Sequence, residues 1–471
     1  MVLEQFYLSC LAHSSYLVGS EGVAAVIDPQ RDVDLYLEAA RERGLRIIAV
    51  IETHLHADFV SGHRELAERT GAQIYIGRDS GVLFPHVPVG DRDTLQLGSL
   101  RLDFLSTPGH TLESICVLLT DASQGTTPHA VFTGDTLFIG DVGRPDLSEE
   151  KSAAELASML YDSLFKKLLT LPDSVLVYPA HGAGSMCGRN IGSERFSTIG
   201  RQRAENYALR ARSLEEFVSL VASELPPRPG YFADDVKLNR TGAAALRNLP
   251  LPPGLSPEDV EMFRGDGAVL LDTRPPADFG SGHIPGAWNI SLGGQFASWA
   301  GTLVGVERSI VLVAADPDRV AESRVRLARV GIENVAGFLQ GGVEGWVASG
   351  REVRTLPQVT VEELGSALER EAGVTVLDVR RLSEWRDGHI KGAIHIPLDR
   401  LQAEMATLDP RAHYAVHCKS GYRSSIACSI LQARGFTAVT NVVGGFDAWT
   451  AAGFPVARDE AARSIQSTSV A

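Results

Sequence analysis

Histidine and aspartate residues recur at related positions in the first 181 residues of the chain. Three of them form one motif directly after the apolar run 47–51, and each of the others follows a later apolar run that is predicted to be a strand. Imidazole and carboxylate groups are ligands for transition metals, and strand ends meet at one edge of a layered α/β fold. A single histidine would be assigned to the core or the surface, but the whole set predicts one shared metal site. Its members are His54, His56, Asp58, His110, Asp135 and His181.

A second chemical motif lies near the C-terminus, where Cys418 follows the predicted strand 414–417 and precedes a predicted helix from residue 424. Backbone N–H groups and the helix N-terminus favour the thiolate of a cysteine on such a loop, and Arg423 adds positive charge. Four residues separate Cys418 from Arg423, one fewer than in tyrosine phosphatase loops, so the smaller cradle suits a sulfane sulfur. The predicted cradle consists of Lys419, Ser420, Gly421 and Tyr422. Cys428, in the middle of the apolar helix, is interpreted as a core residue.

Short apolar runs alternate with turns containing Gly, Asp and Pro up to about residue 170, which is typical of an α/β fold with two sheets. Helical patterns between some of these runs cover 33–44, 61–70 and 150–170. Ser61 is the expected N-cap of the second of these helices. An Arg-rich helical pattern covers 195–221, and the Pro-rich stretch 249–257 is the predicted linker to the rest of the chain.

The chain beyond the linker contains an internal repeat. Asp272 and His283 recur as Asp378 and His389, each with an offset of 106 residues (378 − 272 and 389 − 283). A repeat unit of this length is a whole domain, so duplicated domains are predicted over 256–355 and 358–458. Each is expected to begin with a capped helix, at Ser256 and at Thr360. The polar tail 459–471 is predicted to be disordered.

The second repeat resembles the rhodanese family in its Asp378-Val379-Arg380 segment, in His389 and in the Cys418 loop. This resemblance implies two parallel-sheet α/β domains and a catalytic Cys418 that carries sulfur as a persulfide, with Arg423 beside it. Aligning the repeats places Ala314 opposite Cys418 and Arg319 opposite Arg423. Without a thiol the first repeat cannot carry sulfur, so we expect it to orient the other domains, form an oligomer interface or bind a partner.

Residues 1–245 resemble the metallo-β-lactamase fold family. The matching motifs are the segment around His54, His110 after Pro-Gly, Asp135 after Gly, and His181 after Pro-Ala. The resemblance implies an αββα fold. Two-metal members carry a histidine after the motif aspartate, where this chain has Phe59, so the second metal site is expected to be lost. Two histidines and one carboxylate around one metal form the facial triad of non-haem Fe(II) oxygenases.

That arrangement is similar to the persulfide dioxygenase branch of the family, which implies one Fe(II) held by His54, His110 and Asp135 and no nucleotide cofactor. His56, Asp58 and His181 would then lie beside the metal, although they remain alternative ligands. The implied reaction oxidises a low-molecular-weight thiol persulfide with O2 to sulfite and free thiol. Fused to a rhodanese, it would form or use thiosulfate, with a role in sulfide detoxification.

Two residues near the metal motif are open to more than one interpretation. Arg144 either holds its loop or a substrate carboxylate, or forms a surface pair with Asp146. Cys187 is either an inert buried thiol or a sulfur relay on the substrate side. The arginines Arg195, Arg201 and Arg203 are interpreted as a solvated helix face rather than an anion site.

Two other functions remain open: a thioester hydrolase similar to glyoxalase II, which needs two metals, and a sulfur carrier or scaffold without catalysis. The formal charge of −14 argues against a nucleic-acid partner. The sequence shows neither a signal peptide nor a long apolar span, so no membrane contact is expected. Five unpaired cysteines favour a reducing cytoplasm, and a homo-oligomer is expected.

Overall fold

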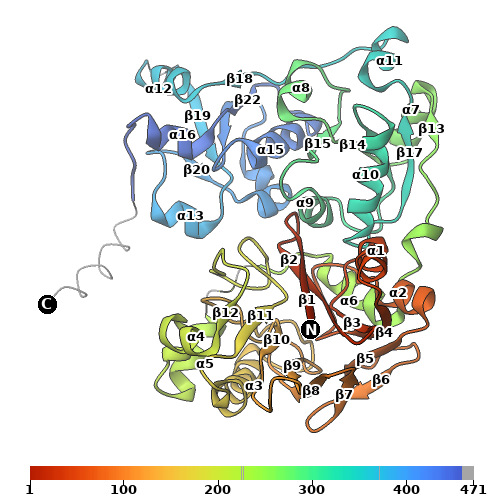
Figure 1. The fold of residues 1–471 in the computed structure, drawn as a ribbon. Coiled ribbons are helices and arrows are strands. Elements are labelled where there is room, and N and C mark those ends of the chain that lie inside the picture. The colour runs from red at the N-terminus through yellow and green to blue at the C-terminus, as the bar shows by residue number, and fades with distance from the viewer. Residues whose placement is uncertain (224, 226, 371, 459–471) are drawn as a thin grey trace, which may run out of the picture. The chain divides into compact units, whose positions relative to one another are not determined.

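The computed structural model describes residues 1–223, 225, 227–370 and 372–458 (Figure 1). These residues form two compact units, one of residues 1–250 with 325–333 and one of residues 251–324 with 334–458. Each unit contains two β-sheets with helices on their faces. The predicted disordered tail, 459–471, lies outside the described residues.

The first unit is built on two six-stranded sheets. The first sheet contains, in spatial order, β1 (Val2–Leu8), β2 (His13–Ser20), β3 (Val23–Ile27), β4 (Arg46–Ile51), β5 (Gln73–Gly77) and β6 (Val87–Val89). The second contains β12 (Ser197–Thr198), β11 (Leu176–Pro179), β10 (Ala130–Gly134), β9 (Ile115–Asp121), β8 (Leu100–Ser106) and β7 (Thr94–Leu97). The helices are α1 (Asp34–Glu42), α2 (His63–Thr70), α3 (Ala153–Lys166), α4 (Ile199–Glu205), α5 (Leu214–Ala222) and α6 (Phe232–Thr241). Short 3-10 turns cover Leu168–Thr170, Ala208–Arg210 and Leu246–Asn248.

Strand β4 shows why the sequence folds into four layers. Its side chains alternate between faces, so Ala49 and Ile51 pack against the second sheet while Val50 packs against the helix layer. Both faces are buried, which accounts for the continuous apolar run 47–51. One core lies between the two sheets, a second lies under α1 and α2, and a third lies under α3 and α5. The predicted αββα arrangement of this part of the chain is therefore confirmed.

The second unit contains two five-stranded sheets in which every strand pair is parallel. The first repeat orders β13 (Gly254–Leu255), β17 (Val335–Leu339), β16 (Ile310–Val313), β14 (Val269–Asp272) and β15 (Trp288–Asn289). The second orders β18 (Gln358–Val359), β22 (Val439–Val442), β21 (His413–His417), β19 (Val374–Asp378) and β20 (Ile394–His395). The strand order is the same in both, which confirms the predicted parallel-sheet repeat.

The helices of the two repeats follow the strands in the same sequence. Those of the first repeat are α7 (Pro257–Gly265), α8 (Pro276–Ser281), α9 (Phe296–Leu303), α10 (Pro317–Ala328) and α11 (Gly342–Ala348). Those of the second are α12 (Val361–Glu369), α13 (Leu382–Asp387), α14 (Leu401–Glu404), α15 (Tyr422–Ala433) and α16 (Gly445–Ala451), with 3-10 turns at Leu398–Arg400 and Met405–Thr407. Ser256 and Thr360 form capping boxes at α7 and α12, as predicted.

Two local predictions were wrong, and one helix was not predicted. Residues 195–221 do not form one helical stretch, because Ser197 and Thr198 pair with β11 before α4 begins. Ser61 is not the N-cap of α2, which begins at His63 after Gly62. Helix α6 was not expected after the Pro-rich stretch that ends near residue 230.

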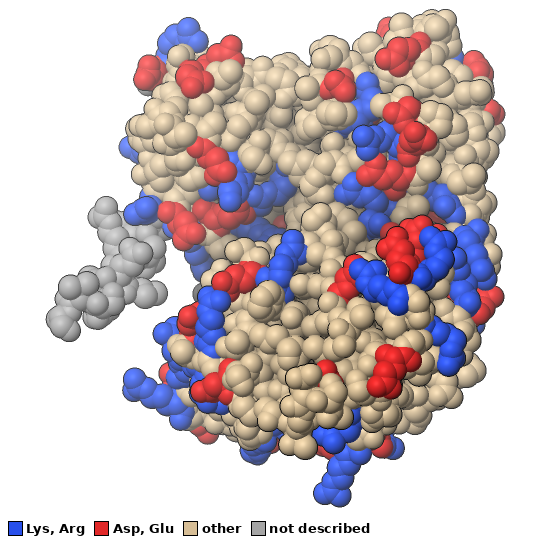
Figure 2. Space-filling view, viewed as in Figure 1, with Lys and Arg blue, Asp and Glu red and all other residues tan. Residues whose placement is uncertain are grey.

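Acidic and basic side chains are interspersed over the face shown in Figure 2. Arg201 pairs with Glu194 and Glu205, and Arg203 pairs with Asp173, all at exposed positions. These two arginines therefore belong to a solvated helix face, as interpreted from the sequence. Within the described residues, no helix is long and apolar enough to span a membrane.

Candidate metal centre and candidate persulfide site

The metal-ligand residues of the first unit follow the C-terminal ends of four strands. The motif 53–58 follows β4, His110 follows β8, Asp135 follows β10 and His181 follows β11. Gly134 makes this convergence possible, because its φ is +51° and a Cβ there would lie 2.5 Å from Thr53 Oγ1.

Three donor atoms from this set point at one another. Asp135 Oδ2 lies 3.3 Å from His110 Nε2 and 3.7 Å from His54 Nε2. All three side chains are buried, and none of these atoms has a hydrogen-bond partner among the described residues. Buried polar atoms are almost always hydrogen-bonded, so three unpaired ligand atoms that face one point fit a bound metal ion. The donor set of two imidazoles and one carboxylate fits a facial triad.

The hydrogen bond at Nδ1 of each histidine fixes its tautomer and therefore which nitrogen faces the site with a lone pair. Thr53 donates its hydroxyl proton to Asp28 Oδ2 at 2.9 Å, so Thr53 Oγ1 accepts from His54 Nδ1–H at 3.0 Å. His110 Nδ1–H donates to the carbonyl of Arg144 at 3.0 Å. Both Nε2 atoms therefore present lone pairs, as metal ligation requires. Burial keeps the pKa of His54 well below its ordinary value and lowers the pKa of His110, so both rings are neutral.

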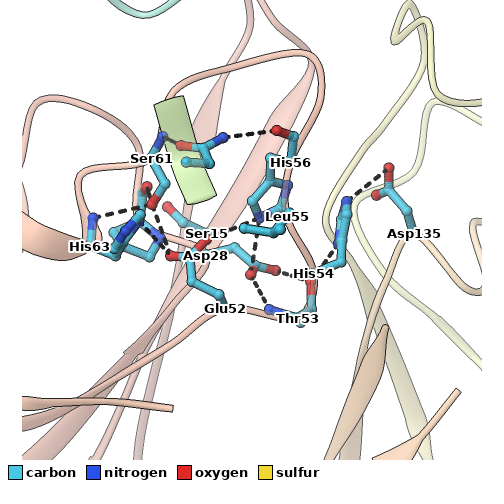
Figure 3. A network of polar contacts seen from close by, with 12 residues as sticks. Ser15, Asp28, Glu52, Thr53, His54, Leu55, His56, Ser61, His63 and Asp135 are labelled. Carbon is cyan, nitrogen blue, oxygen red and sulfur yellow. Dashed lines mark hydrogen bonds and ion pairs between the residues drawn. The ribbon is translucent and has the colours of Figure 1, made fainter. Parts of the chain in front are cut away.

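His56 does not join this triad but turns to the opposite side of the motif (Figure 3). Its Nε2 lies 3.1 Å from Asp28 Oδ1 and 3.6 Å from Glu52 Oε2. Burial alone would lower the pKa of His56, but Asp28 and Glu52 outweigh burial and raise it. Burial raises the pKa of Glu52 to about 8. The His56 imidazolium is thus the counter-ion of Asp28 in a buried network.

His181 lies between two carboxylates. Its Nδ1 is 2.7 Å from Asp135 Oδ1, and its Nε2 is 3.0 Å from Asp58 Oδ2. Burial would lower the pKa of His181, but the two aspartates outweigh burial and hold that pKa well above its ordinary value. Burial likewise opposes ionisation of Asp135, yet the charge of His181 and its hydrogen bond to the carboxylate hold the pKa of Asp135 well below its ordinary value. His181 is therefore an imidazolium that leaves Asp135 ionised.

Cys187 shares the neighbourhood of Asp58 and His181, and the ligand atoms of these three residues lie within 4.8 Å of one another. The thiol is 1% exposed, and burial followed by the charge of Asp58 raises its pKa well above the ordinary value. Cys187 is therefore a protonated thiol, which is a poor nucleophile. Arg144 is 3% exposed, forms two bonds to Asp146 and donates to the carbonyl of Met186, so it holds its loop together.

Phe59 occupies the position where two-metal members of the family carry a histidine. Its ring centroid lies 4.0 Å from that of His13 and 4.4 Å from that of His56. His63 is buried away from the triad, 3.8 Å from Glu52 Oε1 and against Phe84. His13, which packs beside His56 and His181, was not identified from the sequence because it begins β2 rather than ending a strand.

Helix α6 holds the motif loop from a distant part of the chain. Asn239 donates to the carbonyls of His56 and Phe59 and accepts from the N–H of Ser61, each at 2.8 Å. Glu113 also accepts from the N–H of Leu55 at 2.9 Å. Neither residue was predicted, because no local pattern links them to the motif. Asp28 could have been found, since it directly follows the apolar strand β3.

The Cys418 site lies between β21 and α15 in the second repeat. Cys418 Sγ accepts from the N–H of Gly421 at 3.2 Å and from Ser424 Oγ at 3.7 Å. Arg423 forms two bonds to Glu384 of α13, at 2.6 and 2.7 Å. Burial would lower the pKa of Arg423, but Glu384 outweighs burial and raises it, so the guanidinium is held charged beside the sulfur. Lys419 and Ser420 are exposed at the loop tip.

The first repeat keeps the scaffold of this site but not its chemistry. The Arg274–Asp272 pair and the Arg380–Asp378 pair both have a shortest distance of 2.6 Å. Ala314 follows β16 where Cys418 follows β21, and Arg319 is exposed and paired with Glu322. The described residues of this repeat therefore offer neither a thiol nor an inward guanidinium at those positions. Cys428 is buried in α15, in keeping with its interpretation as a core residue.

Comparisons with known proteins assign both parts of the chain. A model described as the metallo-beta-lactamase superfamily matches residues 8–181, and one described as a rhodanese-like domain matches residues 256–349 and 360–452. The crystal structure of a metallo-beta-lactamase from Staphylococcus aureus subsp. aureus COL is 32% identical with a TM-score of 0.65, over 72% of this chain and 98% of that chain. The chain therefore belongs to the metallo-beta-lactamase superfamily and continues into two rhodanese-like domains.

Two curated relatives show which enzymes the first half of the chain is similar to. Over 238 residues the chain is 32% identical to persulfide dioxygenase ETHE1, mitochondrial, of Bos taurus, a match that covers 49% of this chain and 84% of the relative. It is also 31% identical over 245 residues to hydroxyacylglutathione hydrolase of Rhodospirillum rubrum, which covers 51% of this chain and 86% of that relative. The predicted resemblance to persulfide dioxygenases and rhodaneses is confirmed.

Proposed function

We propose that the first unit is an iron-dependent persulfide dioxygenase and that the second transfers sulfane sulfur through Cys418. The observation that carries the first half is the triad of orphaned donors on His54, His110 and Asp135. The reaction is RSSH + O2 + H2O → RSH + SO3²⁻ + 2 H⁺, in which the outer sulfur loses four electrons and O2 gains them. Fe(II) at the triad would supply the redox centre and open positions for sulfur and O2.

The charges around the triad support the proposal of one metal per chain. A second metal would need Asp58 and His181 as ligands, but the imidazolium of His181 is hydrogen-bonded to Asp135 and ion-paired with Asp58. Phe59 cannot ligate a metal in place of the missing histidine. His56 is likewise committed to Asp28 and Glu52. We therefore assign the ligand role to the triad and a supporting role to His56, Asp58 and His181.

The protein residues contribute orientation and charge. Thr53 and the Arg144 carbonyl hold the two imidazoles with Nε2 toward the site. His181 retains its protons at both ring nitrogens and thereby stabilises the Asp135 carboxylate as a ligand. Cys187 is protonated in this arrangement, so we propose no sulfur-relay step through it.

At the second site, the Cys418 thiolate would attack the outer sulfur of thiosulfate, break the S–S bond and release sulfite. The resulting Cys418 persulfide then passes its outer sulfur to a thiolate acceptor, which regenerates the cysteine. The N–H of Gly421 and the Arg423 guanidinium favour the anionic sulfur at each stage. Run in reverse, the same steps join persulfide sulfur to sulfite and form thiosulfate.

The proposal includes a cellular setting. All five cysteines are free thiols, which suits a reducing cytoplasm. The net charge of −14 argues against nucleic acid as a partner, and Figure 2 shows acidic and basic side chains interspersed. We further propose a homo-oligomer that needs no nucleotide cofactor and acts in sulfide detoxification.

Iron-loaded protein supplied with glutathione persulfide tests the dioxygenase. We expect one iron per chain, one O2 consumed per sulfite formed, and loss of both iron and O2 uptake in His110→Ala. His129→Ala, at an exposed histidine outside the site, is the matched control and should keep both. Unchanged persulfide turnover in His110→Ala would instead support a carrier or scaffold.

The competing function is thioester hydrolysis, favoured by the similarity to hydroxyacylglutathione hydrolase. It predicts two metals per chain and hydrolysis of S-lactoylglutathione without O2 uptake. Finding those results together would overturn the dioxygenase proposal.

A further inference from the structure

The cysteine-less repeat contacts the helix that follows the catalytic loop of the second repeat. Within the second unit, α15 packs against β15 of the first repeat. Tyr422, Ser425 and Ser429 occupy positions i, i+3 and i+7 of α15, so they share one face of the helix. The hydroxyl group of each takes part in a hydrogen bond to a residue of the first repeat.

These hydrogen bonds converge on a short segment, Asn289–Ser291. Tyr422 donates its hydroxyl to the carbonyl of Ser291 at 2.9 Å, and Ser425 donates to Asn289 Oδ1 at 2.8 Å. The N–H of Asn289 donates to Ser429 Oγ at 2.9 Å. Asn289, Ser425 and Ser429 are each at most 1% exposed, so water cannot replace these bonds.

Asn289 is suited to this contact by its side chain. Its Nδ2 donates to the carbonyl of Arg274 in its own repeat at 2.9 Å, which leaves Oδ1 free to accept from Ser425. The matching residue of the second repeat, 106 positions later, is His395, whose Nε2 is hydrogen-bonded to the matching carbonyl, that of Arg380, at 2.8 Å. An amide offers a donor and an acceptor at one end, so it can serve both repeats.

Tyr422 connects the contact between the two repeats to the loop that holds the catalytic sulfur. Tyr422 directly follows Gly421, whose N–H donates to Cys418 Sγ, and precedes Arg423, which is held by Glu384. The Tyr422 ring also lies against Gly294, where a Cβ would be 3.4 Å from ring atoms Cε1 and Cζ. A shift of Tyr422 would therefore displace both groups that favour the anionic sulfur.

We propose that the cysteine-less domain positions the catalytic loop, with Tyr422 and Ser425 as the positioning residues through which Asn289 and Ser291 orient the Cys418 cradle. This inference rests on the proposed sulfurtransferase activity of Cys418. It gives the first repeat a role in the reaction although it carries no sulfur. Neither positioning residue needs to touch the substrate.

Tyr422→Phe and Ser425→Ala in the full-length chain test this role, because each removes one hydroxyl and keeps most of the packing. Losing one such bond is expected to lower kcat for sulfur transfer from thiosulfate to cyanide about three- to tenfold. The KM for thiosulfate should change less than kcat. The rate of Cys418 alkylation by iodoacetamide, followed on the Cys418 peptide by mass spectrometry, should fall in parallel.

Gln402→Ala is the matched control. Gln402 Nε2 also donates across the two repeats, to the carbonyl of Leu303 at 2.9 Å, but it does not lie on α15. We expect its kcat and alkylation rate to stay within about twofold of wild type, as for a hydrogen bond that contributes only to stability. Thermal unfolding of all three variants confirms that each is folded.

Unchanged kcat and alkylation rate in both Tyr422→Phe and Ser425→Ala would overturn the proposal, as would an equal loss in Gln402→Ala. If the wild-type chain transfers no sulfur from thiosulfate while Cys418→Ala behaves identically, the sulfurtransferase proposal fails instead. The Cys418 alkylation rates decide the positioning role in that case, because they report on the thiol itself.

Discussion

Replacing Thr53 by valine tests the orientation of the metal ligands without touching a ligand. Valine keeps the shape of threonine but removes the hydroxyl that links His54 Nδ1 to Asp28 Oδ2. The N–H of residue 53 still donates to Asp28 Oδ1 at 2.7 Å, so Asp28 keeps one of its two contacts with that residue. Within the described part of the chain, His54 Nδ1 then has no hydrogen-bond partner on the side of the ring opposite the metal position, so the ring can flip or change tautomer.

The magnitude follows from the two lost hydrogen bonds. Removing the outer partner of a metal-bound histidine typically weakens metal affinity about 10- to 100-fold, or roughly 1.4–2.7 kcal/mol. Asp28 loses a hydroxyl donor in a buried position, which lowers the free energy of unfolding by about 1–3 kcal/mol. Both effects should appear together in Thr53→Val.

The assay is anaerobic Fe(II) titration against a competing chelator, with urea unfolding of the metal-free protein alongside. Thr120→Val is the matched control, because Thr120 is also buried in this unit but its hydroxyl has no partner among the described residues. It should leave iron affinity unchanged and stability unchanged or slightly higher. Equal iron affinity in the two variants would refute the inference that Thr53 orients His54.

Three further outcomes are expected. Burial lowers the pKa of His63 to about 3, against an ordinary value of 6.5, so the unfolded chain binds a proton that the folded chain excludes and stability falls as pH drops below 6.5. His63→Phe should therefore lose less stability than wild type in urea unfolding between pH 6.5 and 4, and equal slopes would contradict this. Asn239→Ala removes three bonds of 2.8 Å from the motif loop and should lower the free energy of unfolding by roughly 3 kcal/mol and weaken iron binding; a loss of stability alone would argue against positioning. Ala314→Cys in a Cys418→Ser background should transfer no sulfur from thiosulfate, because Arg319, which aligns with Arg423, is exposed and paired with Glu322; restored activity would contradict that.

The pattern of apolar runs was sufficient to predict an α/β fold with two sheets and the edge where the ligand-type residues meet, whereas the αββα layers were implied by the family resemblance. Each of His110, Asp135 and His181 follows a strand that the sequence marks clearly. The roles of individual histidines could not be derived in the same way. His54 and His56 are two residues apart, yet one faces Asp135 and the other faces Asp28, because that choice depends on partners from other strands.

Contacts between distant segments were also beyond prediction. Asn239 lies 183 residues from His56, and Asn289 lies 136 residues from Ser425, yet each pair is joined by a direct hydrogen bond. Both asparagines occur in segments without a chemical motif. Side-chain amides bond to whatever the fold brings near, so only the three-dimensional arrangement identifies such partners.

The residue at position 59 accounts for the charges of its neighbours. Phe59 supplies no ligand, so without a second cation the buried Asp58 carboxylate needs positive charge from elsewhere. His181 provides it, with Nε2 3.0 Å from Asp58 and Nδ1 2.7 Å from Asp135. Leaving either carboxylate buried and unpaired would cost several kcal/mol. In the proposed one-iron site, the imidazolium therefore neutralises the charge that a second metal would otherwise neutralise, and redox chemistry is confined to the triad of His54, His110 and Asp135.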